Sequence, residues 1–197
     1  MTRIRLDPEI LLDAYCRGVF PMADHDGQIR WYTADPRGII PLDAFHLPGS
    51  LAQFMRSDSY PFEVRINHDF ERAMRACMEA RPGATWISRE LIRAYTRLHE
   101  MGFAHSVETW EAGALVGGLY GVSVGGAFFG ESMFHRKRDA SKVALVHLVG
   151  RLRERQFVLL DTQANTPHLS RFGCIDIPAR EYLRKLEQAV AVVRQFD

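Results

Sequence analysis

Two carboxylates and an amide are the side chains of this sequence best suited to chemistry. Glu131 lies within the aromatic-rich segment 128–134, which predicts a strand, and a carboxylate is costly to bury there without a partner. Asp161 ends the apolar run 157–160, and Gln163 follows two residues later. Because side chains alternate along a strand, we expect Asp161 and Gln163 on one face. Polar groups at the carboxyl end of a buried strand are typical of sites in open α/β sheets.

A cationic cluster follows the strand that carries Glu131. It consists of Arg136, Lys137, Arg138 and Lys142. Taken alone, the cluster is about as consistent with a solvated loop as with a phosphate-binding patch. Arg89, Arg93 and Arg97 line the outer side of a predicted helix, which is typical of an ordinary solvated face. Since the net charge of the chain is +1, a polyanion would have to bind through a local patch of this kind.

The elements that must position these side chains form an α+β pattern. Hydrophobic periodicity and capping residues predict helices over 8–17, 51–55, 69–80, 89–101, 141–155, 167–173 and 180–195. Strands are predicted over 29–32, 62–66, 105–110, 115–124, 127–134, 157–163 and near residue 175. The three strands within 105–134 are joined by short turns and should be antiparallel, and helix 141–155 should cross over to the next strand.

The turn formers Asp35-Pro36-Arg37-Gly38 predict a boundary between a small N-terminal unit, 1–38, and a main domain, 39–197. A unit of about 40 residues holds too little core to stand alone, so it should pack on the main domain.

Composition and length indicate an ordinary globular protein. The 197 residues are 47% apolar and 25% charged, enough for one domain with a small appendage. The three cysteines are scattered without paired spacing, which favours a reducing compartment and argues against a zinc site. No apolar run reaches membrane-spanning length, and residues 1–7 lack the apolar segment of a signal peptide. We therefore expect a cytoplasmic protein without membrane contact.

An ordered set of short motifs resembles a known enzyme family. In chain order the motifs are Phe20-Pro21, Trp31 with Asp35-Pro36-Arg37, Thr85-Trp86-Ile87, Val116–Gly121, Phe129–Phe134, Ser141-Lys142 and Asp161-Thr162-Gln163. Together they resemble the leucyl/phenylalanyl-tRNA–protein transferases, with matches from Val19 to the last helix. The resemblance implies a GNAT-like acyltransferase domain with a mixed, mostly antiparallel sheet flanked by helices, plus a small N-terminal domain.

The resemblance also implies an activity. Enzymes of this family take leucine, phenylalanine or methionine from aminoacyl-tRNA and join it to the N-terminal arginine or lysine of a protein, which marks that protein for degradation. The partners would be aminoacyl-tRNA and such proteins, and we expect the enzyme to act as a monomer. Because aminoacyl-tRNA is already an activated ester, no metal or other cofactor is expected.

Site residues carry over from the family by position. The catalytic set would be Asp161, Gln163 and Glu131. The substrate-binding set would be Trp86, Met133, Tyr95, Met22 and Phe129. The tRNA-binding set would be Arg56, Arg136, Lys137, Arg138 and Lys142. Trp86 matches an aromatic residue that stacks on the terminal adenine of tRNA, and Met22 stands where many members have a second stacking tryptophan. Met133 falls in the motif that helps line the pocket for the transferred side chain, and Arg56 stands nearly alone in a segment that is often more basic.

The chemistry of the reaction suggests how the catalytic set works. An α-amine has a pKa near 8, so holding it neutral at pH 7 costs only about 1.4 kcal/mol, whereas an ordinary aspartate with a pKa of about 4 is a poorly matched base. Our hypothesis is that Asp161 fixes Gln163, whose carbonyl accepts a hydrogen bond from the attacking amine. Glu131 would hold either the amino group of the acceptor or its basic side chain.

Two other classes of protein are compatible with parts of the pattern. An acyl-CoA-dependent N-acetyltransferase on the same fold would need a glycine-rich turn at a helix start, and segment 138–142 contains no glycine. A non-catalytic RNA-binding module would be disfavoured by Glu131 and Asp161, because carboxylates repel phosphate.

Overall fold

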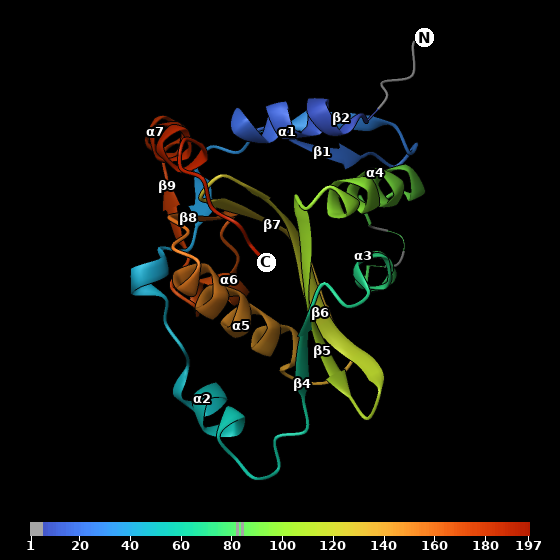
Figure 1. Ribbon diagram of the computed structural model, residues 1–197, viewed down its shortest axis with the longest axis vertical. Helices are drawn as coiled ribbons and strands as arrows, with labels where there is room; N and C mark the ends of the chain where they lie inside the picture. The colour runs from blue at the N-terminus through green and yellow to red at the C-terminus, as the bar shows by residue number, and fades with distance from the viewer. Residues whose placement is uncertain (1–5, 82, 84) are drawn as a thin grey trace.

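A seven-stranded mixed sheet forms the centre of the computed structural model, which describes residues 6–81, 83 and 85–197 (Figure 1). The first five residues of the predicted N-terminal unit lie outside this part of the chain. In spatial order the strands are β4 (Glu63–Ile66), β5 (Ala104–Glu111), β6 (Ala114–Val124), β7 (Ala127–His135), β8 (Leu159–Gln163), β3 (Arg37–Ile39) and β9 (Ile175–Ile177). Neighbouring strands are antiparallel except β7 and β8, which are parallel. The predicted α+β class with a mostly antiparallel sheet is confirmed.

Helices cover both faces of the sheet, as Figure 1 shows. One core cluster receives side chains from α1 (Pro8–Cys16), α3 (Phe70–Glu79), α4 (Arg89–Glu100) and α7 (Ala179–Val190). The other is filled by α5 (Ala140–Glu154), with η1 (Leu42–Ala44), α2 (Gly49–Met55) and α6 (Pro167–Ser170). In the described part of the chain, no helix has both the length and the apolar character needed to cross a membrane.

Local sequence explains the helices that flank the site. The side chain of Asp69 accepts a hydrogen bond from the backbone of Arg72 and caps α3, and Ser88 caps α4 in the same way. Apolar residues at three-four spacing then turn inward. On α4 these buried residues are Leu91, Ile92, Ala94, Tyr95 and Leu98. Both helices match their predicted bounds to within one residue.

The crossover through α5 brings the two candidate catalytic segments together. Strand β7 ends, α5 packs across the sheet, and β8 returns parallel to β7 with Phe129 opposite Asp161. Glu131 lies two residues beyond Phe129 on β7, and Gln163 lies two residues beyond Asp161 on β8. The topology therefore places both segments on adjacent strands at one end of the sheet.

The segment predicted as a boundary turn is partly a strand. Arg37 and Gly38 belong to β3, which pairs with β8 on one side and with β9 on the other. A Cβ at Gly38 would lie 2.5 Å from the backbone of Ala164, so this strand can approach the end of β8 only without a side chain. The turn formers at 35–36 are thus followed directly by a strand, and a division of the chain at residue 38 stays a prediction.

The N-terminal unit packs against the main sheet. Its two-stranded ribbon, β1 (Phe20–Ala23) and β2 (Ile29–Tyr32), lies beside α1 above α4 (Figure 1). Leu11, Tyr15 and Phe20 join the same core cluster as α4 and α7. The unit thus shares the main core, as the sequence predicts for a segment too short to form its own.

Candidate active site

Glu131 is the additional residue of a β-bulge in β7. Gly121 of β6 pairs with Gly130 and Tyr120 pairs with Ser132, so the residue between them has no partner in the β6 ladder. A bulge bends its strand and redirects a side chain. A Cβ on Gly121 would lie 2.3 Å from a backbone oxygen of β7, so a glycine is required opposite the bulge.

The carboxyl of Glu131 is buried, and only one of its two oxygens has a hydrogen-bond partner among the described residues. Its Oε1 accepts hydrogen bonds from Tyr15 Oη at 2.7 Å and from Gln163 Nε2 at 3.0 Å. Its Oε2 is buried without a hydrogen-bond partner among the described residues. Burial raises the pKa of Glu131 to about 8, although the bond from Tyr15 lowers it. This carboxyl therefore exchanges a proton near neutral pH.

Asp161 has a different environment, because it is held by a buried cation. Arg37 donates from Nε to Oδ1 at 3.0 Å and from Nη2 to Oδ2 at 2.6 Å, and the two side chains are 1% and 0% exposed. Tyr182 Oη donates to Oδ2 at 2.6 Å. Burial alone would lower the pKa of Arg37, but its bonds to Asp161 raise it above the ordinary value. Both oxygens of Asp161 are thus occupied by hydrogen bonds from the protein.

Gln163 is positioned by both carboxylates. Its backbone N–H donates to Asp161 Oδ1 at 2.7 Å, and its side-chain amide donates to Glu131 Oε1. Its φ of 64° lies in the left-handed region, which costs a non-glycine residue about 1 kcal/mol. The bond to Asp161 offsets that cost and ends the strand. Among the residues that the structure describes, the side-chain carbonyl of Gln163 has no hydrogen-bond partner and is available to a ligand.

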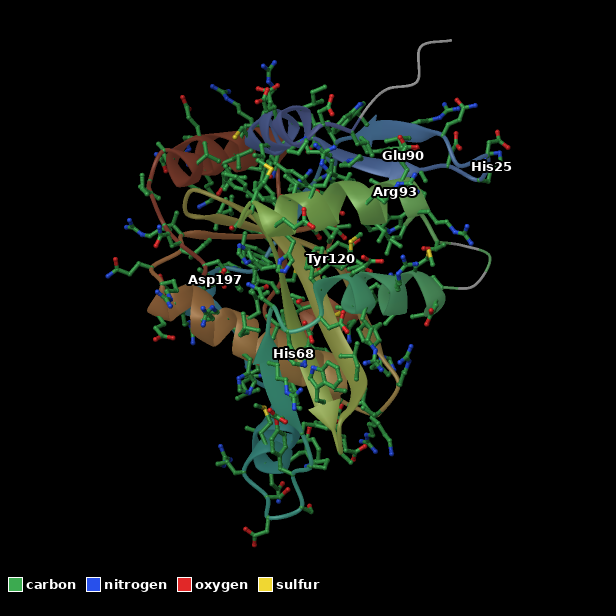
Figure 2. The ribbon with its side chains drawn as sticks, turned by 45° about the vertical axis from the view of Figure 1, so that its right-hand side comes forward. His25, His68, Glu90, Arg93, Tyr120 and Asp197 are labelled. Carbon is green, nitrogen blue, oxygen red and sulfur yellow. The ribbon has the colours of Figure 1, made fainter. Side chains whose placement is uncertain are left out.

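A pocket of about 440 Å³ opens beside these groups. Its polar lining includes Arg81, Tyr120, Glu131, Ser132 and Gln163. Its apolar lining includes Leu119, Met133, Leu145, Leu148, Leu160 and Leu169. The volume suits a small-molecule substituent, and the division into a polar and an apolar wall is typical of substrate pockets. Tyr120 Oη is also buried without a hydrogen-bond partner in the described part of the chain; Figure 2 shows this tyrosine in the central sheet.

The structure brings together some of the predicted site residues and separates others. Glu131, Met133 and Gln163 line the pocket, and Asp161 supports Gln163 from behind. Tyr95 and Phe129 are 0% exposed and do not line the pocket, so the substrate contact expected for them stays a prediction. Both lie behind the site: the Tyr95 hydroxyl is hydrogen-bonded to that of Tyr15, whose ring packs on Phe129.

Trp86 and Met22 lie outside the pocket lining, in neighbouring segments. Both are partly buried against the core cluster of α1 and α4. The backbone N–H of Ala23 donates to the carbonyl of Trp86 at 3.1 Å, which ties the end of β1 to the segment that precedes α4. An adenine-binding role for this pair stays a prediction.

The members of the cationic cluster have acidic neighbours. Arg136 pairs with Glu79 at 3.0 Å and Lys137 with Glu111 at 3.4 Å. Lys142 and Arg138 both contact Asp139, at 2.6 and 3.4 Å. Arg56 is exposed just after α2, which contributes no residue to the pocket lining. The cluster's charge is therefore largely compensated within the protein.

Three supporting residues were missed by the sequence-based interpretation. Sequence patterns place Arg37 in a turn, Tyr15 in the apolar stripe of a helix, and Tyr182 in the terminal helix. Each bonds a residue at least 21 positions away in the chain, and Arg37 and Asp161 are separated by 124 positions. The one available signal was the two tyrosines on helices, where a buried hydroxyl needs a partner; the pattern around Arg37 gave none.

Comparison with known proteins identifies the family. A family model described as leucyl/phenylalanyl-tRNA protein transferase matches residues 39–187, and the model of its N-terminal domain matches residues 5–35. The chain belongs to this family. A relative from Rubrobacter xylanophilus, named leucyl/phenylalanyl-tRNA–protein transferase, is 53% identical over 98% of this chain and 100% of its own length. One of the same name from Phenylobacterium zucineum is 56% identical over 96% of this chain and 87% of its own.

Solved structures show more distant likenesses. A GCN5-related N-acetyltransferase from Kribbella flavida has a TM-score of 0.46 and 10% identity, covering 81% of this chain and 56% of its own. The L-PGS structure from Bacillus licheniformis has a TM-score of 0.45 and 13% identity, and the match covers 95% of this chain and 63% of that chain. Membership of the transferase family, shown by the sequence matches, makes the protein an enzyme that moves an aminoacyl group from tRNA to protein.

Removing the cation from Asp161 should destabilise the fold strongly. Arg37→Met leaves a buried carboxylate without its partner, which should lower the free energy of unfolding by about 3–5 kcal/mol in urea titrations. The double variant Arg37→Met/Asp161→Asn should lose less, because no unpaired charge remains. Arg17→Met, which breaks the exposed pair with Asp13, serves as the control and should change stability by at most about 0.5 kcal/mol. A loss below about 1 kcal/mol for Arg37→Met would contradict this assignment.

The raised pKa of Glu131 predicts a pH-dependent stability. The folded pKa of about 8 exceeds the ordinary value of 4.5, so the folded state binds the proton more tightly and loses stability as pH rises toward 8. Glu131→Gln, which cannot ionise, should therefore become more stable relative to the unmodified protein by up to about 1.4 kcal/mol per pH unit between pH 5 and 8. Urea unfolding at several pH values measures this difference. If the free energy of unfolding changed with pH in the same way for both proteins, Glu131 would have an ordinary pKa.

Proposed function

We propose that this enzyme transfers leucine, phenylalanine or methionine from aminoacyl-tRNA to the N-terminal arginine or lysine of proteins and thereby marks them for degradation. The pocket supports this proposal most directly. It combines an apolar wall large enough for such side chains with a polar wall that carries Glu131 and Gln163. A donor side chain on the apolar wall would place its ester carbonyl beside these two polar groups.

Donor selection follows from the lining of the apolar wall. Leucine buries about three more carbons than alanine, which is on the order of 2 kcal/mol, or a preference of roughly thirtyfold. Met133 lies among leucines from β6, α5 and β8, and its flexible side chain can adapt to leucine, phenylalanine or methionine. A side chain branched at Cβ carries its bulk next to the ester, where Glu131 and Gln163 limit the space. We therefore expect isoleucine and valine to be poor donors.

Gln163 orients the acceptor amine in this proposal. The buried Arg37–Asp161 pair fixes the backbone of Gln163, and the side-chain amide of Gln163 donates a hydrogen bond to Glu131. The free carbonyl then accepts a hydrogen bond from the attacking amine. Holding the nitrogen against the ester carbon contributes several kcal/mol through orientation alone.

Glu131 is the proton acceptor. Its pKa of about 8 matches that of an α-amine, so a proton passes between the two groups at little cost. The amine nitrogen forms the new bond to the ester carbon, and the bond from that carbon to the ribose oxygen breaks. Glu131 takes the proton from nitrogen and returns it to the ribose oxygen, so the carboxyl is restored. Asp161 is unsuited to this role, because Arg37 and Tyr182 occupy its oxygens.

The terminal nucleotide of tRNA would bind at Trp86 and Met22. The two residues lie in segments joined by a backbone hydrogen bond, and both keep part of their surface exposed. An aromatic ring beside a thioether gives a base one firm stacking surface and one adaptable surface. In the cationic cluster, Arg138 is the side chain best placed for phosphate, because it is 95% exposed.

Transfer of labelled amino acids to a peptide with N-terminal arginine tests the proposal. Leucyl-, phenylalanyl- and methionyl-tRNA should serve as donors, isoleucyl-tRNA should react at least about tenfold more slowly, and Met133→Ala should weaken the use of leucine. A peptide with N-terminal alanine is the matched control acceptor. Equal use of isoleucine would contradict the pocket assignment. Acetylation of the peptide by acetyl-CoA, without transfer from tRNA, would favour an N-acetyltransferase instead.

A further inference from the structure

Helix α4 carries a row of arginines on its outer surface. Arg89, Arg93 and Arg97, here termed the α4 arginine row, are all exposed. Among the residues that the structure describes, none of the three forms an ion pair within 4 Å or a side-chain hydrogen bond. In the cationic cluster of 136–142, by contrast, each member has an acidic partner. The α4 arginine row therefore carries three positive charges that no acidic side chain compensates among the described residues.

The row is rigidly supported. The opposite side of α4 is buried, with Leu91, Tyr95 and Leu98 at 0% exposure, and Ser88 caps the helix. Positions four apart on a helix are about 6 Å apart along its axis, so the row extends over about 12 Å. One strand of a nucleic-acid duplex presents three to four phosphates over about that length, at roughly 3.4 Å per nucleotide.

The charges around the row leave its centre positive. Glu90 and Glu100 are the acidic residues of α4. In Figure 2, Arg93 lies on the surface of α4, and Glu90 lies toward the β1–β2 ribbon. On α3, Arg75 already pairs with Glu71. Arg93 is thus free to meet a ligand charge at the middle of the row.

The position of the row connects it to the site. Arg89 is three residues from Trp86, whose carbonyl bonds the end of β1. Tyr95, on the buried side of the same helix, bonds Tyr15, which donates to Glu131. An RNA end that binds at Trp86 would therefore lie next to Arg89, at the start of α4.

We propose that the α4 arginine row binds the sugar-phosphate backbone of the acceptor end of tRNA. The proposal rests on the proposed function, since it requires an aminoacyl-tRNA donor. Guanidinium groups suit phosphate because their planar donors bind two oxygens at once, and an even spacing along a straight helix fits a regular polyanion better than the irregular surface of an acidic protein. The interaction contributes binding and leaves the chemical step unchanged.

A triple variant tests the row: Arg89→Gln, Arg93→Gln and Arg97→Gln. Glutamine keeps the helix propensity and removes three charges. The KM for aminoacyl-tRNA should rise about tenfold or more at about 0.15 M salt, and the slope of log kcat/KM against log salt should become shallower by about 2. The kcat at saturating tRNA should not change. With an aminoacyl-adenosine as donor, which lacks the acceptor stem, KM should also stay unchanged.

The matched control is the triple variant Arg155→Gln, Arg180→Gln and Arg184→Gln. These arginines are also exposed, lie on or next to α5 and α7, and carry no ion pair among the described residues. Equal KM values and salt slopes for the two triple variants would overturn the proposal, and so would a raised KM for the acceptor peptide alone. Arg93→Gln by itself repeats the test if the triple variant folds poorly.

Direct binding separates failure of this inference from failure of the proposed function. Fluorescence anisotropy with uncharged tRNA needs no transfer reaction, so it reports on the row even if the enzyme uses other donors or acceptors. Weaker binding by the α4 triple variant than by the control variant supports the row. Equal binding by the two variants would show that the α4 arginine row does not bind tRNA.

Discussion

The buried ion pair between Arg37 and Asp161 is the interaction on which the rest of the site depends. It joins β3 to β8, and Arg37 also donates to the carbonyl of Gly18, which lies just after α1. Tyr182 of α7 completes the set. Two charges out of water are favourable only when every oxygen and nitrogen has a partner, so the pair holds distant segments in one arrangement. That arrangement fixes the end of β8, where Gln163 turns toward the pocket.

The two carboxylates differ because their surroundings differ. Asp161 faces a permanent cation, accepts further hydrogen bonds from Tyr182 and the backbone of Gln163, and serves as a fixed point. Glu131 lies in a bulge among tyrosines, with one oxygen unsatisfied among the described residues and its pKa raised to about 8. Burial without a cation raises the pKa of a carboxyl and suits it to accept a proton near neutral pH, whereas a buried cation suits a carboxylate to a positioning role.

Sequence patterns predicted the parts of the fold that depend on local physics. Helices α3 and α4 follow from their caps and three-four apolar spacing, and the hairpin turn at Glu111–Gly113 follows from its glycine. The resemblance to the family pointed to Glu131, Met133 and Gln163 as site residues, and all three line the pocket. The bulge at Glu131 could not be predicted, because one inserted residue leaves no mark on an aromatic-rich strand. The partner of Asp161 could not be predicted either. Arg37 follows a proline in a turn-forming segment, and nothing local points to a carboxylate 124 positions away.

The pH dependence of transfer by Asp161→Asn tests most directly whether Asp161 positions Gln163 without exchanging protons. The measurement is kcat/KM for the acceptor peptide from about pH 5.5 to 9, a range that spans the pKa of an α-amine, on protein whose folded state is verified by circular dichroism. A supporting role predicts a lower rate that still rises with pH through an apparent pKa, because Glu131 and the amine still titrate; that pKa should shift downward, since the charge of Asp161 no longer raises the pKa of Glu131. Loss of that pKa in Asp161→Asn, with the rate restored at high pH, would show that Asp161 is the proton acceptor.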